Sequence, residues 1–311
     1  MPETGLEQWN YKYTPLEAIR KRMGRAYEEA ITPFFAGAVH FTQKPFVRIL
    51  IVGGGKGHFS RDMLPAIKRE LAEKARKSGT HPQKMEVFET DLVPEAVARA
   101  PGNNSKPNRL VRKLAADIHA IPFSDGRFDL VFGESIIHQG GNNNLEARIK
   151  EIKRVMNDKG IFIHIQDNVP FTEESVTPDQ AKKAGFTLQA INKGMTPEQN
   201  KSLIELADSA HNILIQKTHA AAKANNLSFA LGKVQGEVME PSSRPFKLPN
   251  GNSFTEFNSI QHNYGIFIPE NDSGISNKER RLKYSGFVKI ITKLPSVRGF
   301  LNHLEKEFNV H

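Results

Sequence analysis

Residues 53 to 57 are the first stretch whose composition suggests chemistry. The segment "FVRILIVGGGKGHFS" (46–60) changes from an apolar run to four glycines: Gly53, Gly54, Gly55 and Gly57. Before them, Val47–Val52 has the composition of a strand that is buried on both faces. Glycines directly after such a strand let the backbone turn sharply and approach a ligand closely. The segment therefore predicts a ligand-binding loop at the end of a strand.

This glycine loop, residues 53–57, differs from two phosphate-binding patterns. Leu50 stands where a P-loop has its first glycine, and Gly57 replaces the Ser or Thr that should follow Lys56. The dinucleotide fingerprint needs a glycine at its sixth position, where this chain has His58. The spacing that fits is Gly-x-Gly-x-Gly. We interpret it as a loop for a ligand whose chain lies flat against the backbone.

Two acidic residues follow later strands of the predicted sheet. The segment "VFETDLVPEAVARA" (87–100) ends a strand on Asp91 and begins a helix at Pro94. A carboxylate in that position can accept hydrogen bonds from both hydroxyls of a ribose. The segment "AADIHAIPFSDGRFDLVFGES" (115–135) places Asp117 just after another strand, where an acid can meet an adenine amino group. Together these residues indicate a nucleoside beside the glycine loop.

Residues 46 to about 166 resemble the core of class I S-adenosylmethionine-dependent methyltransferases. The segments that carry the resemblance follow in order: "ILIVGGGKG", "TDLVPEAV", "ADIHAIPFSDGRFDLVFGESIIH" and "ARIKEIKRVMNDKGIFIHI". The last has Asp-Lys-Gly where the family usually has Pro-Gly-Gly. The resemblance implies a doubly wound, mostly parallel α/β sheet with a Rossmann-like core. It also implies a transferase enzyme with S-adenosyl-L-methionine as its cofactor.

The resemblance further implies which residues contact the cofactor. The glycines would lie along its methionine part, Asp91 at the ribose, Asp117 and Ile118 at the adenine, and Glu134 near the sulfonium. The full predicted set is Gly53, Gly54, Gly55, Gly57, Asp91, Leu92, Asp117, Ile118, Glu134 and Ser135. The family usually has an acid two positions before its first glycine, and this chain has Ile51 there. Other groups must therefore hold the methionine end.

Methyl transfer from a sulfonium needs a positioned acceptor and, for many acceptors, removal of a proton. His138, in "GESIIHQGG" (133–141), follows the fourth predicted strand and is the candidate base. Its alternative is a surface or helix-capping histidine. His164 alternates with Ile163 and Ile165 in a strand, so we expect it to be packed and hydrogen-bonded.

A metal-dependent variant of the chemistry is the alternative to a general base. Glu134, Asp167 and Asn168 match the layout of catechol-type O-methyltransferases, and three oxygen ligands plus waters would suit Mg²⁺. However, Asp-Asn after a strand is also an ordinary turn, and "PFSDGRFD" looks more like the metal-independent branch. The sequence therefore predicts no metal, with these three residues as the alternative divalent site.

The favoured function is methyl transfer to an oxygen or nitrogen of a small-molecule acceptor. Ile51 and the lack of an obvious base leave open a methyltransferase-fold binding or regulatory protein without activity. A macromolecular enzyme acting on RNA or protein also stays open, although the net charge of +9 is spread thinly along the chain. "GESI" in place of an Asn/Asp-Pro-Pro-aromatic loop, and zero cysteines, exclude two nucleic-acid subclasses. We expect a cytoplasmic protein without membrane partners, because no apolar stretch could span a bilayer. The oligomeric state is not predicted.

Alternating strand and helix patterns must position these residues. Strands are expected at Val47–Val52, Met85–Thr90, Leu110–Ala115, Phe128–Gly133 and Ile161–Ile165, with helices at Phe59–Lys77, Pro94–Ala100 and Leu145–Met156. "MNDKG" (156–160) predicts a helix end and a tight turn. We expect an N-terminal helical extension (1–45), a cofactor-binding core (46–168), a mainly helical insertion that could act as a lid (169–277), and a return to the sheet with a C-terminal helix (278–311).

Three helix signals lie outside the core. "TPLE" (14–17) predicts a helix from Thr14 to about Ile31 that Pro33 stops. "TPEQ" (196–199) begins a long amphipathic helix that runs from Glu198 to about Ala224. The segment "RRLKYSGFVKIITKL" (280–294) is expected to form a helix, a glycine turn and a strand.

Overall fold

The computed structural model describes residues 29–55, 57, 59–94, 97, 111–134, 136–138, 144–166, 197–241 and 279–308. Within these, only the backbone is described for 62, 166, 197–208, 211, 233–241 and 279–287. Contacts divide the chain into two compact units. One contains Ile31–Gln166, Lys217–Val234 and Phe287–His311, and the other contains Met1–Ala30, Asp167–Gln216 and Gln235–Gly286. The glycine loop and the residues predicted near it belong to the first unit.

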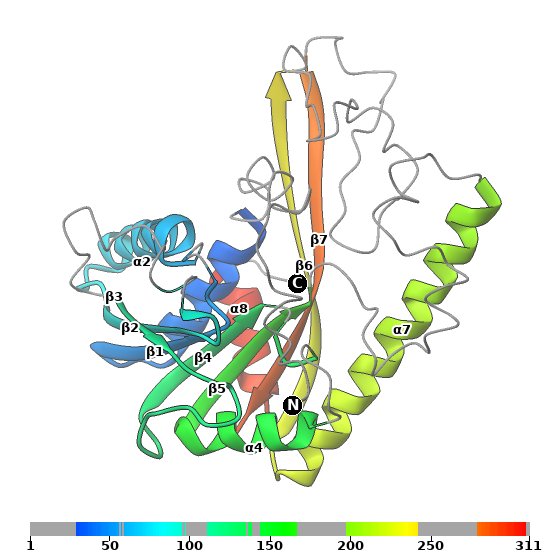
Figure 1. The fold of residues 1–311 in the computed structure, drawn as a ribbon. Helices are drawn as coiled ribbons and strands as arrows, with labels where there is room; N and C mark the ends of the chain where they lie inside the picture. Colours follow the sequence, from blue (N-terminus) through cyan, green and yellow to red (C-terminus); the bar gives the residue numbers. More distant parts are fainter. Residues whose placement is uncertain are drawn as a thin grey trace. The chain divides into compact units, whose positions relative to one another are not determined.

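A seven-stranded sheet forms the framework, in the order β3-β2-β1-β4-β5-β7-β6 (Figure 1). The strands are β1 (Phe46–Val52), β2 (Lys84–Asp91), β3 (Val111–Ala115), β4 (Phe128–Glu134), β5 (Met156–Gln166), β6 (Ser228–Pro241) and β7 (Glu279–Thr292). Strands β1 to β5 are parallel, and β7 pairs antiparallel with β5. The predicted fold class, a doubly wound and mostly parallel α/β sheet, is confirmed.

Helices cover both faces of the sheet, as Figure 1 shows. They are a π-helical turn η1 (Phe59–Met63), α2 (Leu64–Ser78), α4 (Leu145–Val155), α7 (Pro197–Ala224), α8 (Arg298–Phe308) and a helix over residues 29–41. On one face the ring of Phe35 lies 4.6 Å from Phe132 and 4.9 Å from Phe59. On the other, Leu50 and Phe162 share a core cluster with residues of α4 and the last turns of α7. The apolar runs of β1 and β4 therefore serve a sheet that is buried on both sides.

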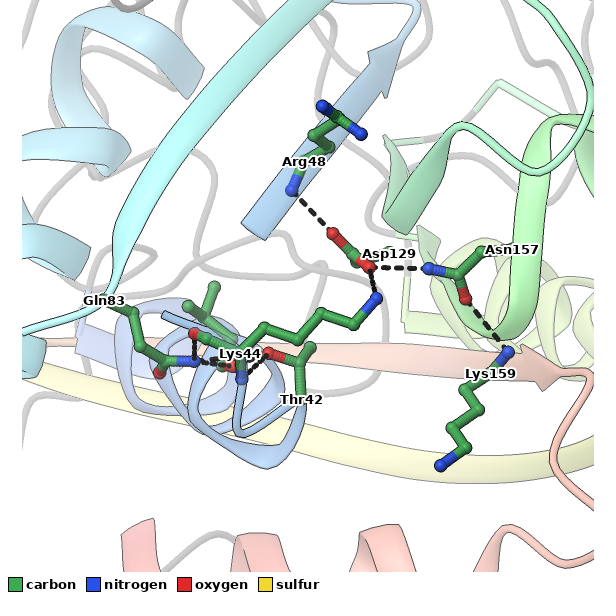
Figure 2. A network of polar contacts seen from close by, with 8 residues as sticks. Thr42, Lys44, Arg48, Gln83, Asp129, Asn157 and Lys159 are labelled. Atoms are coloured by element: carbon green, nitrogen blue, oxygen red, sulfur yellow. Dashed lines mark hydrogen bonds and ion pairs between the residues drawn. The ribbon is translucent and has the colours of Figure 1, made fainter. Parts of the chain in front are cut away.

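A polar network fastens the amino ends of β1, β4 and β5 (Figure 2). The buried carboxylate of Asp129 accepts the backbone N–H of Arg48 at 2.8 Å and the side-chain amide of Asn157 at 2.6 Å. It also forms an ion pair with Lys44. Asn157 in turn accepts the backbone N–H of Lys159 at 2.9 Å. Both carboxylate oxygens of Asp129 are thus engaged with neighbouring elements.

The expected helix end at Pro33 is wrong. Residues 29–41 are helical, so the helix continues through the proline. Ile31, Phe34, Phe35 and Ala38 have the i, i+3, i+4, i+7 spacing and are all buried. Their burial offsets the hydrogen bond that a proline cannot donate within a helix. The predicted start at Thr14 lies outside the described residues.

The expected tight turn at 156–160 lies within β5 and not before it, because a Cβ on Gly160 would lie 2.6 Å from Cβ of Met156. Helix α4 ends at Val155 as predicted, but β5 begins directly at Met156. The pairing of β5 with β4 shifts register between Phe128 and Leu130, and the additional residues of β5 are accommodated there. Asn157 donates to Asp129 of β4 and accepts the N–H of Lys159 in its own strand, and these bonds hold the turn against the sheet.

The segment 280–294 contains no helix or glycine turn. Its first part belongs to β7, which runs as one strand through Gly286 and pairs with β5 from Phe287 to Thr292. Strand pairing with β5 and β6 outweighs the local helix preference of the Arg- and Lys-rich start. The predicted long helix is present as α7. Among the described helices, none is long and apolar enough to cross a membrane.

Candidate functional site

The strand order places the glycine loop where open α/β sheets bind ligands. Strand β1 pairs with β2 on one side and with β4 on the other, so the chain winds outward in both directions from this pair. Ligands bind at the carboxyl ends of the strands at such a switch point. The glycine loop follows β1, and Ile136 to His138 follow β4. Sequence positions that are far apart therefore meet at one edge.

The glycines are needed for two different reasons. Gly53, Gly55 and Gly57 have φ values of 70°, 52° and 79°, a region that residues with a Cβ rarely adopt. Gly54 needs its missing side chain, because a Cβ there would overlap Cγ of Glu89 and lie 2.8 Å from its Oε1. A Cβ on Gly53 would lie 2.9 Å from Cδ1 of Ile136. The loop is thus held closely between β2 and the segment after β4.

Asp91 is the residue that ties the glycine loop to the second strand. Its Oδ2 accepts the N–H of Gly55 at 2.7 Å, and its Oδ1 accepts the N–H of Val93 at 2.9 Å. Its backbone carbonyl accepts the N–H of Ala116 at 2.8 Å, which brings the segment after β3 to the same place. Each carboxylate oxygen keeps lone-pair capacity for a further donor. Leu92 beside it is 53% exposed.

Glu89 is a buried acid beneath the glycine loop that the sequence prediction missed. It stands directly opposite Ile51 in the β1–β2 register, so an acid lies on the neighbouring strand where β1 lacks one. Its Oε2 accepts from Ser60 at 2.9 Å and pairs with Lys113 at 3.2 Å. Its Oε1 has no hydrogen-bond partner among the described residues. Burial raises the pKa of Glu89, and Lys113 and Ser60 only partly oppose this.

Asp117 begins a hydrogen-bonded chain that reaches the segment after β4. Its Oδ1 accepts the backbone N–H of His119 at 2.9 Å and lies 2.8 Å from Nδ1 of that ring. Arg148 of α4 donates from Nε to Nε2 of His119 at 3.0 Å and from Nη1 to the carbonyl of Ile137 at 2.7 Å. Burial alone would raise the pKa of Asp117, but the bonds from His119 and the charge of Arg148 outweigh it and lower this pKa. Ile118 packs against the core cluster.

A second buried polar cluster lies across β4, β5 and β7. Gly133, His164 and Lys289 are paired in register and share one face of the sheet, where His164 and Lys289 are 0% and 1% exposed. His138, 3% exposed, folds over them. Its Nε2 lies 2.8 Å from Nζ of Lys289 and 3.1 Å from Oγ1 of Thr218 in α7. His138 is therefore a buried residue of the switch-point edge, and the surface alternative is wrong.

His164 is packed as predicted, but only half of its ring is hydrogen-bonded. Nε2 accepts the backbone N–H of Ile136 at 3.2 Å, while Nδ1 has no partner among the described residues. Burial, followed by the cationic forms of Lys289 and His138, holds the pKa of His164 well below its usual value. The ring is thus neutral, with its hydrogen on Nδ1.

The remaining predicted site residues lie on the other side of the sheet from the His164 cluster or outside the described residues. Glu134 ends β4 opposite Ile165, so it faces the other side of the sheet from His164. Ser135, Asp167 and Asn168 lie outside the described residues, so the alternative metal site stays an untested prediction. In the part of the chain that the structure describes, no three His, Asp or Glu side chains are grouped as a metal site.

The sequence contained signals for the missed residues. Glu89 and Lys289 are both charged residues inside apolar strands, in "EVFETD" and "GFVKIIT". A charged residue in a buried strand must have a partner or a function. Arg148 is the one charged member of the buried face of α4. These signals could indicate burial, but not the partners that the fold supplies.

A comparison with protein-family models now adds independent information. A model described as a methyltransferase domain matches residues 50–164, which span the glycine loop, Asp91, Asp117, His138 and His164. Residues 50–164 are thus similar to a methyltransferase domain. No curated protein matches the chain. The matched segment thus includes the glycine loop and, of the polar cluster, His138 and His164.

Several solved structures are similar to this chain at low identity. The YcgJ protein from Bacillus subtilis is 15% identical, with a TM-score of 0.44, over 85% of this chain and 100% of its own. The plantazolicin methyltransferase BpumL, in complex with a monoazolic desmethylPZN analogue and S-adenosylhomocysteine (SAH), is 13% identical, with a TM-score of 0.48, over 93% of this chain and 92% of its own. A methyltransferase from Aquifex aeolicus is 12% identical, with a TM-score of 0.40, over 89% and 99%. Likenesses of this size carry no argument about substrate.

Proposed function

We propose that this protein is an S-adenosylmethionine-dependent methyltransferase that acts on an oxygen or nitrogen of a small-molecule acceptor. The observation that carries the proposal is the fastening of the glycine loop to Asp91, at 2.7 Å from the N–H of Gly55. This contact puts a carboxylate with spare acceptor capacity beside a loop in which Gly53 and Gly54 have no room for a Cβ. The cofactor would supply a methyl group activated on a sulfonium.

The residues around the loop suit such a nucleoside. Asp91 would accept from the ribose hydroxyls, and Asp117 together with Ile118 would hold the adenine. Asp117 has its Oδ1 bound to His119, which fixes the side chain before a ligand arrives. The glycines would lie against the methionine part. Leu92, Glu134 and Ser135 complete the proposed contacts.

Glu89 supplies what the first strand lacks. Its carboxylate lies against Gly54 and is linked to the loop by Ser60, whose hydroxyl lies 3.1 Å from the carbonyl of Gly57 and 2.9 Å from Oε2 of Glu89. We propose that Glu89 fixes the loop from beneath and contributes the negative charge that favours the cofactor's ammonium. With Glu89 in this role, the missing acid at Ile51 gives no reason to prefer an inactive binding protein.

The small-molecule acceptor is supported by the burial of the proposed base. His138 is 3% exposed and lies directly after β4. Methyl transfer requires its acceptor atom in line with the methyl group, at near-contact distance. An acceptor that reaches an enclosed histidine has to be small or has to offer a slender end. We expect tritiated methyl groups from the cofactor to enter the low-molecular-weight fraction of a cell extract, and label in RNA or protein would contradict this acceptor class.

Calorimetric titration with S-adenosylmethionine and SAH tests the cofactor site. We expect micromolar binding, about −7 to −8 kcal/mol. Asp91→Ala should weaken both ligands by about tenfold or more, because a hydrogen bond to a charged group contributes about 1.5–3 kcal/mol. Asp125→Ala is the matched control, since this carboxylate is exposed and pairs with Arg154. No heat at millimolar ligand, or equal losses in both variants, would contradict the proposed site.

A further inference from the structure

Two histidines face each other where α8 packs on the helix over residues 29–41. His40 lies in the last turn of that helix, and His303 lies in the middle of α8. Nδ1 of His40 is 3.3 Å from Nε2 of His303, and the two ring planes are inclined by 15°. Both residues are half-buried. They are 263 positions apart in the chain, and the proposed function uses neither of them.

The two helices are closely packed around this pair. A Cβ on Gly37, one turn before His40, would lie 2.5 Å from Cδ2 of Leu304 in α8. The backbone of Gly37 also accepts a hydrogen bond from the ring of His303. The ring of Phe308 lies 5.6 Å from that of His40 and 6.0 Å from that of His303. The pair is therefore part of a close helix contact and not two separate surface side chains.

The contact between the two rings depends on their charge. While at least one ring is neutral, a lone pair on one nitrogen can accept the N–H of the other. When both rings are protonated, hydrogens occupy both facing nitrogens and two positive charges lie side by side. Burial, followed by the charge of Lys74, lowers the pKa of His40. Burial, followed by the charge of His40, lowers the pKa of His303. The closed contact thus disfavours protons.

Among the described residues, the charged groups that act on the pair are Lys74 of α2 and Glu307 of α8. Lys74 donates from Nζ to Oε2 of Glu307 at 2.8 Å and to its backbone carbonyl at 2.9 Å. Lys306 pairs with Oε1 of Glu307 at 3.7 Å. Glu307 raises the pKa of both histidines, but by less than burial lowers it. Protonation of both rings would therefore leave an excess of positive charge between the helices.

The helix over residues 29–41 also packs on the segment that follows the glycine loop. Its Phe35 is fully buried, and the ring lies 4.9 Å from that of Phe59 at the start of η1. Ser60, the next residue of η1, has its hydroxyl 3.1 Å from the carbonyl of Gly57. One helix thus contacts α8 through the histidine pair and the glycine loop through η1.

We propose that His40 and His303 form an acid-sensitive clasp, which fastens α8 to the helix over residues 29–41 and thereby holds the glycine loop in its binding conformation. The clasp is closed above about pH 6.5, the ordinary value for histidine. Because the closed clasp disfavours protons, its stability is lost as the pH falls below that value. Phe35 is then no longer held on Phe59, and cofactor affinity falls. The effect on the cofactor rests on the proposed function, whereas the clasp itself does not.

Amide hydrogen exchange at pH 7.5 and 5.0, corrected for the intrinsic effect of pH, tests the clasp without a ligand. The key variant is His40→Asn/His303→Gln, because its two amides can form hydrogen bonds but do not titrate. From pH 7.5 to 5.0 we expect the protection of α8 to fall about tenfold more in the wild type than in this double variant. His164 is unchanged in both proteins, so its own pH effect cancels. The control His81→Gln, at an exposed site, should match the wild type.

Exchange in η1 and calorimetry with SAH test the link to the glycine loop. We expect the protection of η1 to follow that of α8. Between the two pH values, SAH affinity should fall about threefold or more in the wild type relative to the double variant. Equal changes in both proteins would overturn the link. Failure of every protein to bind SAH would instead reject the proposed cofactor site, and the exchange of η1 would then decide the link.

Equal falls of α8 protection in the wild type and the double variant would overturn the clasp. Histidine NMR on the wild-type protein keeps it testable if the double variant does not fold. The single variants His40→Asn and His303→Gln identify the two ring signals by their loss. We expect both rings to titrate below about pH 6.5, and titration of either ring at or above this value would overturn the clasp.

Discussion

Two buried carboxylates, Asp129 at the amino edge of the sheet and Glu89 near its carboxyl edge, differ in how fully they are hydrogen-bonded. At the amino edge, Asp129 has both carboxylate oxygens bound, to the N–H of Arg48 and to Asn157 and Lys44 (Figure 2). At the carboxyl edge, Oε1 of Glu89 and Nδ1 of His164 are buried without a partner among the described residues. Satisfied networks rigidify a fold, whereas unsatisfied buried groups cost stability. The comparison indicates that Asp129 stabilises the amino edge and that Glu89 and His164 retain polar atoms near the carboxyl edge, where a ligand would bind.

Asp129→Ala should have the largest effect on stability. The variant leaves the buried N–H of Arg48 and the amide of Asn157 without their acceptor, and each unsatisfied buried group costs about 1–3 kcal/mol. We expect urea unfolding to show a loss of about 3 kcal/mol, with SAH affinity unchanged wherever the protein is folded. A loss below about 1 kcal/mol would show that the amino edge is not the stabilising one.

Gly54→Ala should mainly damage binding at the other edge. The added Cβ would overlap Glu89, so the loop must move away from β2. We expect calorimetry to show SAH affinity lower by about tenfold or more, equivalent to about 1.4 kcal/mol. Gly299→Ala is the control, because a Cβ there meets no atom within 4 Å. If the close contact is the cause, Glu89→Ala should partly restore the position of the loop in the double variant.

The buried His164 should make stability depend on pH. Its pKa is held well below the usual value in the folded protein, so the unfolded chain binds a proton that the folded one does not. This contribution is complete above about pH 6.5, the unfolded value, and falls by up to about 1.4 kcal/mol for each unit below it. Urea unfolding at pH 7.5 and 5.5 measures the slope. His164→Gln should have a shallower slope than the exposed-site control His81→Gln, and equal slopes would contradict the burial of a neutral ring.

Lys44→Met should have the smallest effect. The side chain of Lys44 is 47% exposed, so its ion pair with Asp129 is screened by solvent. Asp129 keeps its bonds to Arg48 and Asn157 in this variant. We expect less than about 1 kcal/mol of lost stability in urea unfolding. A loss as large as that of Asp129→Ala would mean that the ion pair, and not the two amide donors, stabilises the amino edge.

Much of the fold could be predicted because it follows from local patterns. The apolar run before Gly53 and the acid at Asp91 indicate a strand, a turn and a second strand end without knowledge of the rest. The glycine loop and Asp91 were accordingly predicted as neighbours. The helix through Pro33 and the straight strand β7 were not predicted, because tertiary packing and strand pairing there outweigh local preference.

The polar partners of the carboxyl edge could not be predicted from the sequence. Lys289 meets His138 because β7 returns antiparallel beside β5, and no local pattern fixes that register. Glu89 takes the place opposite Ile51 for the same reason, since the pairing of β1 with β2 is set by the whole sheet. The spacing of residues along the chain identifies those that belong to one motif. Residues that become neighbours across strands can be named only when the strand order and register are known.

Amide NMR during titration with SAH tests the central claim most directly, because it reports on both edges of the sheet in one experiment. We expect saturable shifts at the carboxyl edge, in the N–H signals of Gly53, Gly55, Val93 and Ile118. The signals of Arg48 and Lys159 at the amino edge should stay in place. Shifts at the amino edge, or no saturable shifts at millimolar SAH, would contradict a cofactor site formed by the glycine loop and Asp91.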